Sequence, residues 1–264
     1  MLWSLWFAAK GLPSVLVLLV FLAGTVLTRS AGCVMNDFAD RDFDGHVSRT
    51  SNRPLATGLV TPREAIYLAV VLTLMAFALV LLMNTKTVLY SMVAVVLAAV
   101  YPFAKRFTWW PQLLLGAAFG WAIPMASVAQ TGATTATTWW LFLAALVWTV
   151  AYDTLYAMAD REDDIKVGIK STAILFGRAD VAIIGLLYGF VICLLAYVGL
   201  KESMGLAYFV GLGVAAVLFA RHLWTVRHRD PLACFNAFLN NHYVGMVVFM
   251  GIALDFYRDH SAAL

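Results

Sequence analysis

The chain has few charged residues for its length, and this shortage decides the solvent in which it folds. Charged residues make up 12% of the 264 positions and hydrophobic residues 62%, whereas a soluble domain carries about 25% charged residues. The mean hydropathy is +0.84. This composition excludes an ordinary soluble domain and indicates a protein that lies in a lipid bilayer.

Cysteine is scarce too, and the common nucleotide-binding motifs are missing from the sequence. Cys33, Cys193 and Cys234 stand singly with no C-x-x-C pair, so we expect neither a disulfide nor a zinc site. The sequence contains no glycine-rich P-loop and no G-x-G-x-x-G motif, so neither a P-loop nor a dinucleotide-binding fold is indicated. We also expect no nucleic-acid partner. No basic segment precedes the first apolar run, so that run is not expected to be a cleavable signal peptide.

Long uncharged runs take up most of the chain, and a membrane-spanning helix needs about 20 apolar residues. The runs cover 11–28, 65–85, 87–104, 107–152, 181–200, 203–220 and 231–254. The run 107–152 holds two spans, separated by the polar stretch 130–138. We therefore expect an all-α polytopic membrane protein with eight full spans, and residues 2–9 read as the end of a ninth.

Two acidic clusters interrupt this apolar sequence. Residues 36–44 read N-D-F-A-D-R-D-F-D and residues 152–164 read Y-D-T-L-Y-A-M-A-D-R-E-D-D, so each contains a D-x-x-x-D pair, at Asp40 and Asp44 and at Asp160 and Asp164. Carboxylates four residues apart lie on one face of a helix and repel each other. Two such pairs predict a cation between them, and Mg²⁺ is the hard, oxygen-binding candidate.

Both clusters are predicted to face the same side of the membrane, because they end the second and the sixth of nine expected helices. Fourteen Lys and Arg residues fall on that side, against four on the other, namely Lys10, Lys86, Lys201 and Arg258. Positive charge accumulates in cytoplasmic loops. We therefore expect a multi-pass protein with its acidic loops on the cytoplasmic side of the membrane.

Arginines and lysines are mixed with the carboxylates in both clusters. Carboxylates hold metal ions, and neighbouring guanidinium and ammonium groups hold oxyanions, so the mixture predicts a metal–diphosphate site. Solvated loops at the membrane edge are the alternative interpretation of either cluster alone. Matching spacing in two clusters on one side favours the site.

The motifs of these clusters resemble those of the UbiA superfamily of intramembrane prenyltransferases. Residues 36–44 fit the pattern N-D-x-x-D-x-x-x-D, and Arg49, Arg53 and Pro54 fit R-x-x-x-R-P. The stretch 152–172 is similar to the hydroxybenzoate branch of the superfamily, with Glu162 at a position that is often aspartate. The segment Y-P-x-x-K-R, at residues 101–106, also fits.

The resemblance implies a fold and a reaction. The implied fold is a single domain, residues 1–264, with nine transmembrane helices in a ring around a central cavity, the first present here as a stub, and two Asp-rich cytoplasmic loops. The implied location is the bacterial inner (cytoplasmic) membrane. The implied reaction is Mg²⁺-dependent and belongs to ubiquinone biosynthesis. It transfers a polyprenyl group from an all-trans polyprenyl diphosphate to the carbon ortho to the hydroxyl of 4-hydroxybenzoate, and pyrophosphate leaves.

The resemblance also implies roles for individual residues. The expected metal ligands are Asn36, Asp37, Asp40, Asp44, Asp153, Asp160 and Asp164. Five of these aspartates are also expected to act in catalysis through their charge, namely Asp40, Asp44, Asp153, Asp160 and Asp164. The cations expected to hold the diphosphate or the benzoate carboxylate are Arg49, Arg53, Lys105, Arg106, Arg161, Lys166 and Lys170.

Two alternatives remain at this stage. Another aromatic acceptor, such as a dihydroxynaphthoate or homogentisate, would use the same motifs. A transporter is less favoured, because transporters carry their ionisable residues inside the spans and here these residues crowd one rim. The sequence leaves open the prenyl chain length, the group that deprotonates the ring, for which Asp153 and pyrophosphate are candidates, the oligomeric state and any protein partner.

The start of the chain is unusual for the superfamily that it resembles. The stub at residues 2–9 rises only about 12 Å at about 1.5 Å per residue, which is too short for a hydrocarbon core of about 30 Å. Superfamily members usually begin with a further stretch that supplies the first half of this helix. We therefore expect Met1 to be a mis-assigned or alternative start.

Overall fold

The computed structural model describes residues 1–45 and 50–262, without the side chains of residues 43, 44 and 259–262, and its described residues form helices without a strand. The helices, in chain order, are α1 (Leu2–Ala9), α2 (Val15–Asp44), α3 (Pro62–Val80), α4 (Thr85–Phe107), α5 (Pro111–Gly120), α6 (Ala122–Thr131), α7 (Ala136–Ala159), α8 (Arg161–Val167), α9 (Thr172–Phe176), the 3₁₀-helix η1 (Gly177–Ala179), α10 (Asp180–Lys201), α11 (Leu206–Val226) and α12 (Pro231–Ala262).

Eight segments are long and apolar enough to cross a membrane, which confirms the eight full spans expected from the sequence. Helices dominate because a bilayer offers no water to the backbone, so each spanning segment must satisfy its own N–H and C=O groups. One of the eight spans joins α5 and α6, which meet at Trp121. The stub expected at residues 2–9 is α1. Within the described residues, a ninth full span is not present.

Local sequence signals set several helix ends. Thr61 caps α3 in a capping box with Glu64, and Pro62 occupies the first helical turn. Asn84 and Thr135 accept backbone N–H groups at the starts of α4 and α7. Gly132 ends α6 at a φ of 76°, a left-handed conformation that glycine adopts at little cost. These caps lie in the short connections where the chain reverses between spans.

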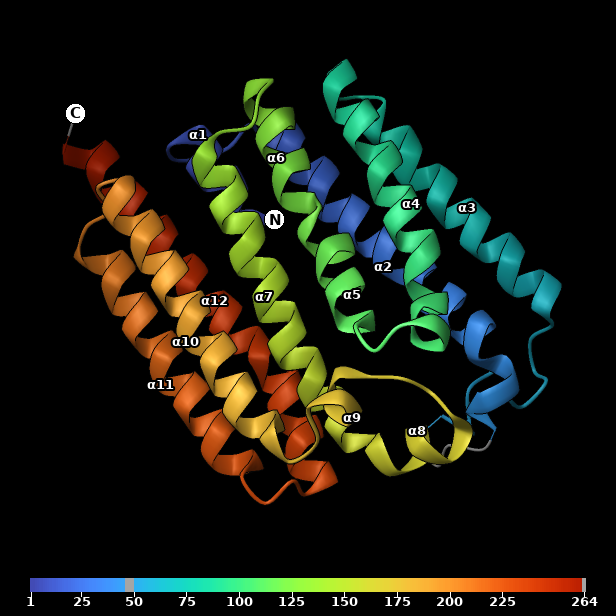
Figure 1. The fold of residues 1–264 in the computed structure, drawn as a ribbon. Helices are drawn as coiled ribbons and strands as arrows, with labels where there is room; N and C mark the ends of the chain where they lie inside the picture. Colours follow the sequence, from blue (N-terminus) through green and yellow to red (C-terminus); the bar gives the residue numbers. More distant parts are fainter. Residues whose placement is uncertain (46–49, 263–264) are drawn as a thin grey trace.

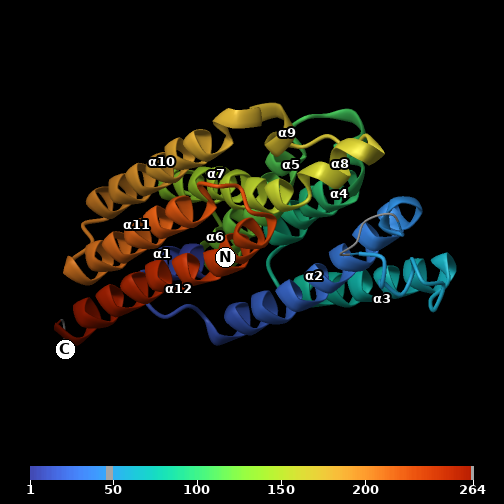
Figure 2. The same ribbon diagram turned by 90° about the horizontal axis from the view of Figure 1, so that it is seen from below.

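Helix α7 is the centre of the bundle and packs against α5, α10 and α12 (Figure 1). Seen from the end that carries α8, helices α10, α11 and α12 lie together on one side and α2 and α3 on the other (Figure 2). Close packing depends on glycine, since a Cβ on Gly116 of α5 would stand 2.8 Å from the carbonyl oxygen of Leu146 on α7. Small residues at such contacts let helices approach closely inside a membrane.

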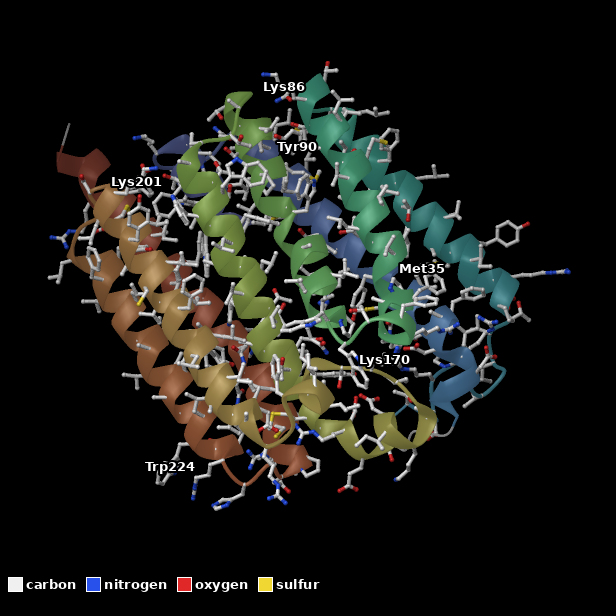
Figure 3. All side chains as sticks on the ribbon, in the orientation of Figure 1. Met35, Lys86, Tyr90, Lys170, Lys201 and Trp224 are labelled. Atoms are coloured by element: carbon white, nitrogen blue, oxygen red, sulfur yellow. The ribbon has the colours of Figure 1, made fainter. Side chains whose placement is uncertain are left out.

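The two ends of the bundle carry different connections. Lys86 and Lys201 lie at one end, and Lys170 and Trp224 lie at the other (Figure 3). The connections that follow α2, α4, α7 and α11 are all at the Lys170 end, so both acidic clusters meet there. We expected the first acidic cluster to form a loop. The cluster is helical instead, because α2 continues through Asp44.

Candidate functional site

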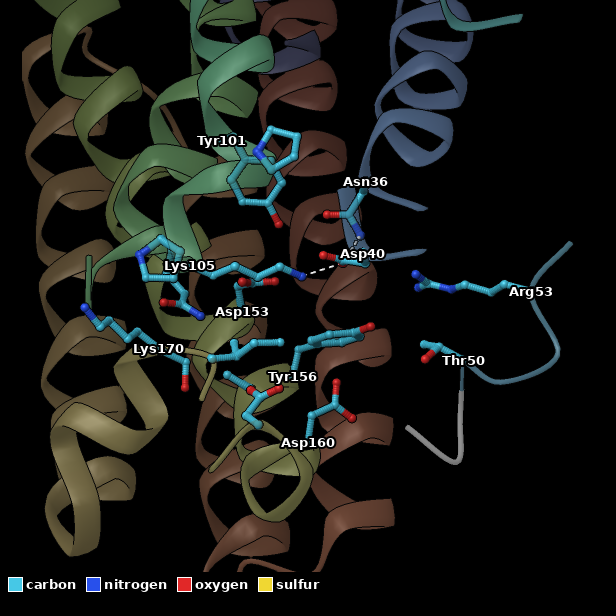
Figure 4. Close-up of a pocket in the computed structure, with 17 residues that line it drawn as sticks. Asn36, Asp40, Thr50, Arg53, Tyr101, Lys105, Asp153, Tyr156, Asp160 and Lys170 are labelled. Carbon is cyan, nitrogen blue, oxygen red and sulfur yellow. Dashed lines mark hydrogen bonds and ion pairs between the residues drawn. The ribbon is translucent and has the colours of Figure 1, made fainter. Parts of the chain in front are cut away.

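Side chains from both acidic clusters line one cavity of about 120 Å³ at the Lys170 end of the bundle (Figure 4). The cavity lies where α2, α4, α5, α7 and α8 converge. Its polar lining consists of Asn36, Asp40, Thr50, Arg53, Tyr101, Lys105, Gln112, Asp153, Tyr156, Asp160, Asp164, Lys170 and Ser171. Acidic and basic residues from distant parts of the sequence thus line the same cavity.

The first cluster contributes an amide and a carboxylate from adjacent turns of α2. Asn36 Nδ2 donates a hydrogen bond to Asp40 Oδ2 at 3.2 Å. The Asp40 side chain is buried, and the ammonium group of Lys105 on α4 forms an ion pair with it. A buried carboxylate is costly unless a hydrogen-bonded cation accompanies it. The pair therefore fixes the end of α4 against the end of α2.

Arg53 reaches the cavity from the segment that follows α2. Its backbone N–H donates to the carbonyl oxygen of Thr50 at 3.0 Å, and Thr57 N–H donates to the Arg53 carbonyl at 2.9 Å. Its guanidinium lies 2.9 Å from Asp37 Oδ1. In Figure 4 the Lys105 side chain extends to Asp40, and Arg53 approaches from the other side. Asp37 therefore holds Arg53 at the rim.

The second cluster presents its carboxylates along the end of α7 and the start of α8. Asp153 and Tyr156 lie about one turn apart on α7, and Asp160 follows one turn later as the N-cap of α8. Asp164 lies a further turn along, on α8. Helical spacing thus turns all four side chains toward the same cavity.

The segment after α8 forms part of the cavity wall. Gly168 takes a φ of 74° and reverses the chain, and Ile169 N–H returns to the Asp164 carbonyl at 2.9 Å. Lys170 N–H then donates to the carbonyl oxygen of Lys105 at 3.0 Å, which joins this segment to α4. Lys170 lines the cavity, but its ammonium group lies 3.5 Å from the carbonyl oxygen of Phe107 and 5.6 Å from the ring centroid of Trp109.

Other predicted site residues do not line this cavity. The Arg106 guanidinium donates to the carbonyl oxygen of Ala39. Arg161 forms an ion pair with Asp180. Lys166 pairs with Asp163 at 2.9 Å, and this carboxylate raises the pKa of the exposed ammonium group. The side chain of Asp44 and the whole of Arg49 lie outside the described residues. The roles predicted for these residues stay predictions.

Sequence reasoning missed several cavity residues. Gln112 lines the cavity, and its Oε1 accepts the backbone N–H of Thr172 at 3.1 Å. Its signal was available, because it is a polar residue beside Pro111 in the uncharged run 107–152. Thr50 and Ser171 gave no distinct signal, since hydroxyl residues are common in connecting segments.

The donor set suits a magnesium ion that is shared with a phosphate ligand. Among the described residues, no three His, Cys, Asp or Glu side chains stand close enough to hold a metal by themselves. Mg²⁺ normally takes only one or two carboxylates and completes its shell with water and substrate phosphates. Asn36, Asp40, Asp160 and Asp164 place oxygen donors around one cavity, which fits this type of coordination. Arg53 and Lys105 line the same cavity and are cations suited to phosphate oxygens.

Fold and site together define a polytopic helical membrane protein with a cavity at one end of its bundle that is lined by carboxylates and cations. Residues 1–249 match the UbiA prenyltransferase family, and the chain belongs to this family. The resemblance seen in the sequence motifs is thereby confirmed.

Curated relatives match the chain over nearly its full length. The 4-hydroxybenzoate octaprenyltransferase of Alkalilimnicola ehrlichii is 58% identical over 255 residues, which cover 97% of this chain and 87% of that protein. The enzyme of the same name from Pseudomonas aeruginosa is 55% identical over 97% of this chain and 86% of its own length.

Solved structures share the fold. The apo structure of a UbiA homolog from Aeropyrum pernix has a TM-score of 0.83 at 26% identity, covering 96% of this chain and 97% of that one. A UbiA homolog from Archaeoglobus fulgidus, bound to GPP and Mg²⁺, has a TM-score of 0.73 at 20% identity and covers 96% of this chain and 93% of that one. The second likeness concerns the fold alone.

Proposed function

We propose that this chain transfers a polyprenyl group from an all-trans polyprenyl diphosphate to 4-hydroxybenzoate, at the ring carbon ortho to the hydroxyl, and releases pyrophosphate. The observation that carries the proposal is the shared cavity, in which Asp40 of the first cluster and Asp160 and Asp164 of the second lie with three cations. Relatives named 4-hydroxybenzoate octaprenyltransferase, at 55–58% identity, support the choice of acceptor.

The carboxylates and the cations have different proposed roles: the carboxylates hold the metal ion, and the cations contact the diphosphate. Asn36, Asp40, Asp160 and Asp164 would hold Mg²⁺, which when bound stabilises negative charge on the departing pyrophosphate. A UbiA homolog with the same fold is bound to GPP and Mg²⁺, which supports Mg²⁺ and a prenyl diphosphate as ligands of this fold. Arg53 and Lys105 would donate to phosphate oxygens, where charge grows as the allylic C–O bond breaks. The ammonium group of Lys170 would first have to leave the carbonyl oxygen of Phe107.

The reaction then proceeds by electrophilic substitution on the ring. The C–O bond breaks with its electron pair going to the diphosphate oxygen, and the ring carbon ortho to the hydroxyl forms the new C–C bond to the allylic carbon. The proton on that ring carbon leaves to restore aromaticity, and Asp153, which lines the cavity, or the pyrophosphate takes it. The ring of Tyr156 lies at the cavity and offers a π face to the allylic cation.

An aromatic series on α7 leads from this cavity toward an apolar one. Tyr156, Tyr152 and Trp148 follow one another at helical spacing, and the rings of Tyr152 and Trp148 are 5.7 Å apart. Trp148 lines a second cavity of about 390 Å³ between α1, α7 and α12, with Trp3 and Phe249. We assign the polyprenyl chain to this apolar route, because its hydrocarbon would be poorly placed among carboxylates.

The location follows from composition and charge. The chain is a multi-pass membrane protein, and its substrate tail is itself soluble in lipid. We place the cavity end on the cytoplasmic side of the bacterial inner membrane, because most Lys and Arg residues lie at that end. Keeping water from the carbocation is a physical reason to carry out this chemistry within a membrane protein.

An assay on membranes tests the proposal. Membranes that contain the protein are supplied with Mg²⁺, labelled 4-hydroxybenzoate and a ladder of prenyl diphosphates, and prenylated label is extracted and counted. We expect product that depends on both substrates and little competition from a dihydroxynaphthoate or homogentisate. Preferential prenylation of either competitor would reassign the acceptor.

A further inference from the structure

A buried carboxylate outside the cavity joins three elements at the Lys170 end. Asp180, the first residue of α10, has an exposed fraction of 0%. It accepts hydrogen bonds from the Arg161 guanidinium at the start of α8 and from Arg229 Nε at 2.9 Å. Arg229 belongs to the turn between α11 and α12. One side chain thus connects α8, α10 and the α11–α12 turn.

Further contacts of Arg229 and Arg161 hold this junction in place. Arg229 takes a φ of 59°, which is uncommon for a non-glycine residue, and its guanidinium also donates to the carbonyl oxygen of Arg178 at 2.7 Å. The Nε of Arg161 is buried without a hydrogen-bond partner, so the Arg161 guanidinium depends on Asp180 for its hydrogen bond. Losing one member of such a buried pair leaves an uncompensated charge.

The junction holds one end of the segment that carries the second acidic cluster. Arg161 directly follows Asp160, and Asp164 is one turn further on α8. The other end of the segment is held by the backbone bond from Lys170 to Lys105 and by the bond from Thr172 to Gln112. The two cavity carboxylates therefore lie between two fixed points.

We propose that Asp180 is a positioning residue for the metal–diphosphate site and that it acts through Arg161 to place Asp160 and Asp164. The proposal rests on the proposed function, because it concerns the same cavity. It gives Arg161 a role different from holding a substrate oxyanion, since the guanidinium faces Asp180 and does not line the cavity.

Direct metal binding provides a test that does not require turnover. Mn²⁺, which also prefers oxygen ligands, is titrated into purified protein with inorganic pyrophosphate and followed by electron paramagnetic resonance. Outer-shell residues typically change metal affinity by about 10- to 100-fold, and we expect Asp180→Asn to weaken Mn²⁺ binding within that range. In turnover, the Mg²⁺ concentration for half-maximal rate should rise similarly, with the KM for 4-hydroxybenzoate unchanged.

Asp255→Asn is the matched control. Asp255 on α12 is also a buried aspartate, at 6% exposure, and accepts the backbone N–H of Gly205 in the connection between α10 and α11, at the opposite end of the bundle. Both variants should lower the thermal unfolding temperature, but Asp255→Asn should keep wild-type Mn²⁺ affinity. If both lose stability and Asp180→Asn also keeps wild-type affinity, the role of Asp180 is only structural and the proposal is wrong.

A paired variant covers the case in which Asp180→Asn does not accumulate. Combining it with Arg161→Gln removes both buried charges and keeps side chains that can hydrogen bond, so this protein should fold while still binding Mn²⁺ weakly. Wild-type affinity in the paired variant would overturn the proposal. If the wild-type protein binds no Mn²⁺ with pyrophosphate, the metal site and this proposal fail together, whereas prenylation of a different acceptor overturns only the proposed acceptor.

Discussion

At the scale of single residues, the cationic residues at the Lys170 end are of two kinds. Some line the cavity, and others lie at the same end of the bundle without lining it. Arg53 lines the cavity, whereas Arg227 is exposed and lies over the ring of Trp224, with 4.1 Å to the ring centroid. The two side chains carry the same charge, but of the two only Arg53 lines the proposed diphosphate site. A comparison of the two therefore isolates local contact from the general field of the protein.

Arg53→Ala should raise the KM for the prenyl diphosphate by about tenfold or more, because a hydrogen bond to a charged group contributes roughly 1.5–3 kcal/mol. The KM for 4-hydroxybenzoate should change less. Arg227→Ala is the control and should leave both constants at wild-type values. Steady-state kinetics on membranes with matched expression make the comparison. Equal effects of the two substitutions would mean that Arg53 acts only through long-range charge.

Gln112 illustrates what sequence reasoning could not reach at this scale. Its amide bonds to Thr172, 60 positions away in the chain, and such a partner depends on how α5 and the segment before α9 meet. The Arg161–Asp180 pair was missed for the same reason, since Asp180 opens an apolar run and has no motif around it. The motif residues that line the cavity could be proposed from the sequence, because metal ions and phosphates are bound by few residue types. Their mutual contacts were not.

At the scale of helices, apolar runs predicted the spans well, because a bilayer requires helices of a known length. The end of α2 was harder. Its charged residues suggested a loop, but Asn36 and Asp40 pair across one helical turn and Lys105 neutralises Asp40, so the helix continues through them. Tertiary pairing thus outweighed the local repulsion of the carboxylates.

Contact between α5 and α7 depends on Gly116, and this gives a prediction about packing. A methyl group there would stand 2.8 Å from the Leu146 carbonyl oxygen, whereas a Cβ on Gly213 of α11 meets nothing within 4 Å. Gly116→Ala should force α5 away from α7, lowering the unfolding temperature and the activity, because α5 carries Gln112. Gly213→Ala should be neutral or stabilising, since alanine favours a helix over glycine by about 1 kcal/mol.

Thermal unfolding in detergent, with activity measured on the same preparations, distinguishes these outcomes. The prediction is contradicted if Gly116→Ala unfolds at the wild-type temperature and retains full activity. A parallel loss in Gly213→Ala would show that any added methyl group on these helices is harmful, and that the α5–α7 contact is not special.

At the scale of the whole molecule, the fold brings together two clusters that are 120 positions apart, counting from Asp40 to Asp160. The matching motifs and the even number of spans between them allowed their meeting to be predicted. The depth and shape of the cavity could not be, because they depend on the reversal at Gly168 and on the link between Lys170 and Lys105.

The proposed metal site gives a prediction about metal dependence. Prenyl transfer should stop when membranes are treated with EDTA and should return when Mg²⁺ is added in excess, because the diphosphate is a poor leaving group without charge neutralisation. The measurement is labelled product against free Mg²⁺ concentration. Full activity in thoroughly chelated membranes would remove the metal from the mechanism.

The central claim is that carboxylates of α2 and of the α7–α8 corner hold one metal–diphosphate complex, and a double-mutant cycle tests it most directly. Asp40→Asn and Asp160→Asn should each lower turnover by about a hundredfold or more, the scale for removing one electrostatic stabiliser. Because both act on the same complex, the double variant should be little slower than either single one. Losses that multiply in the double variant would show two independent roles and contradict the shared site.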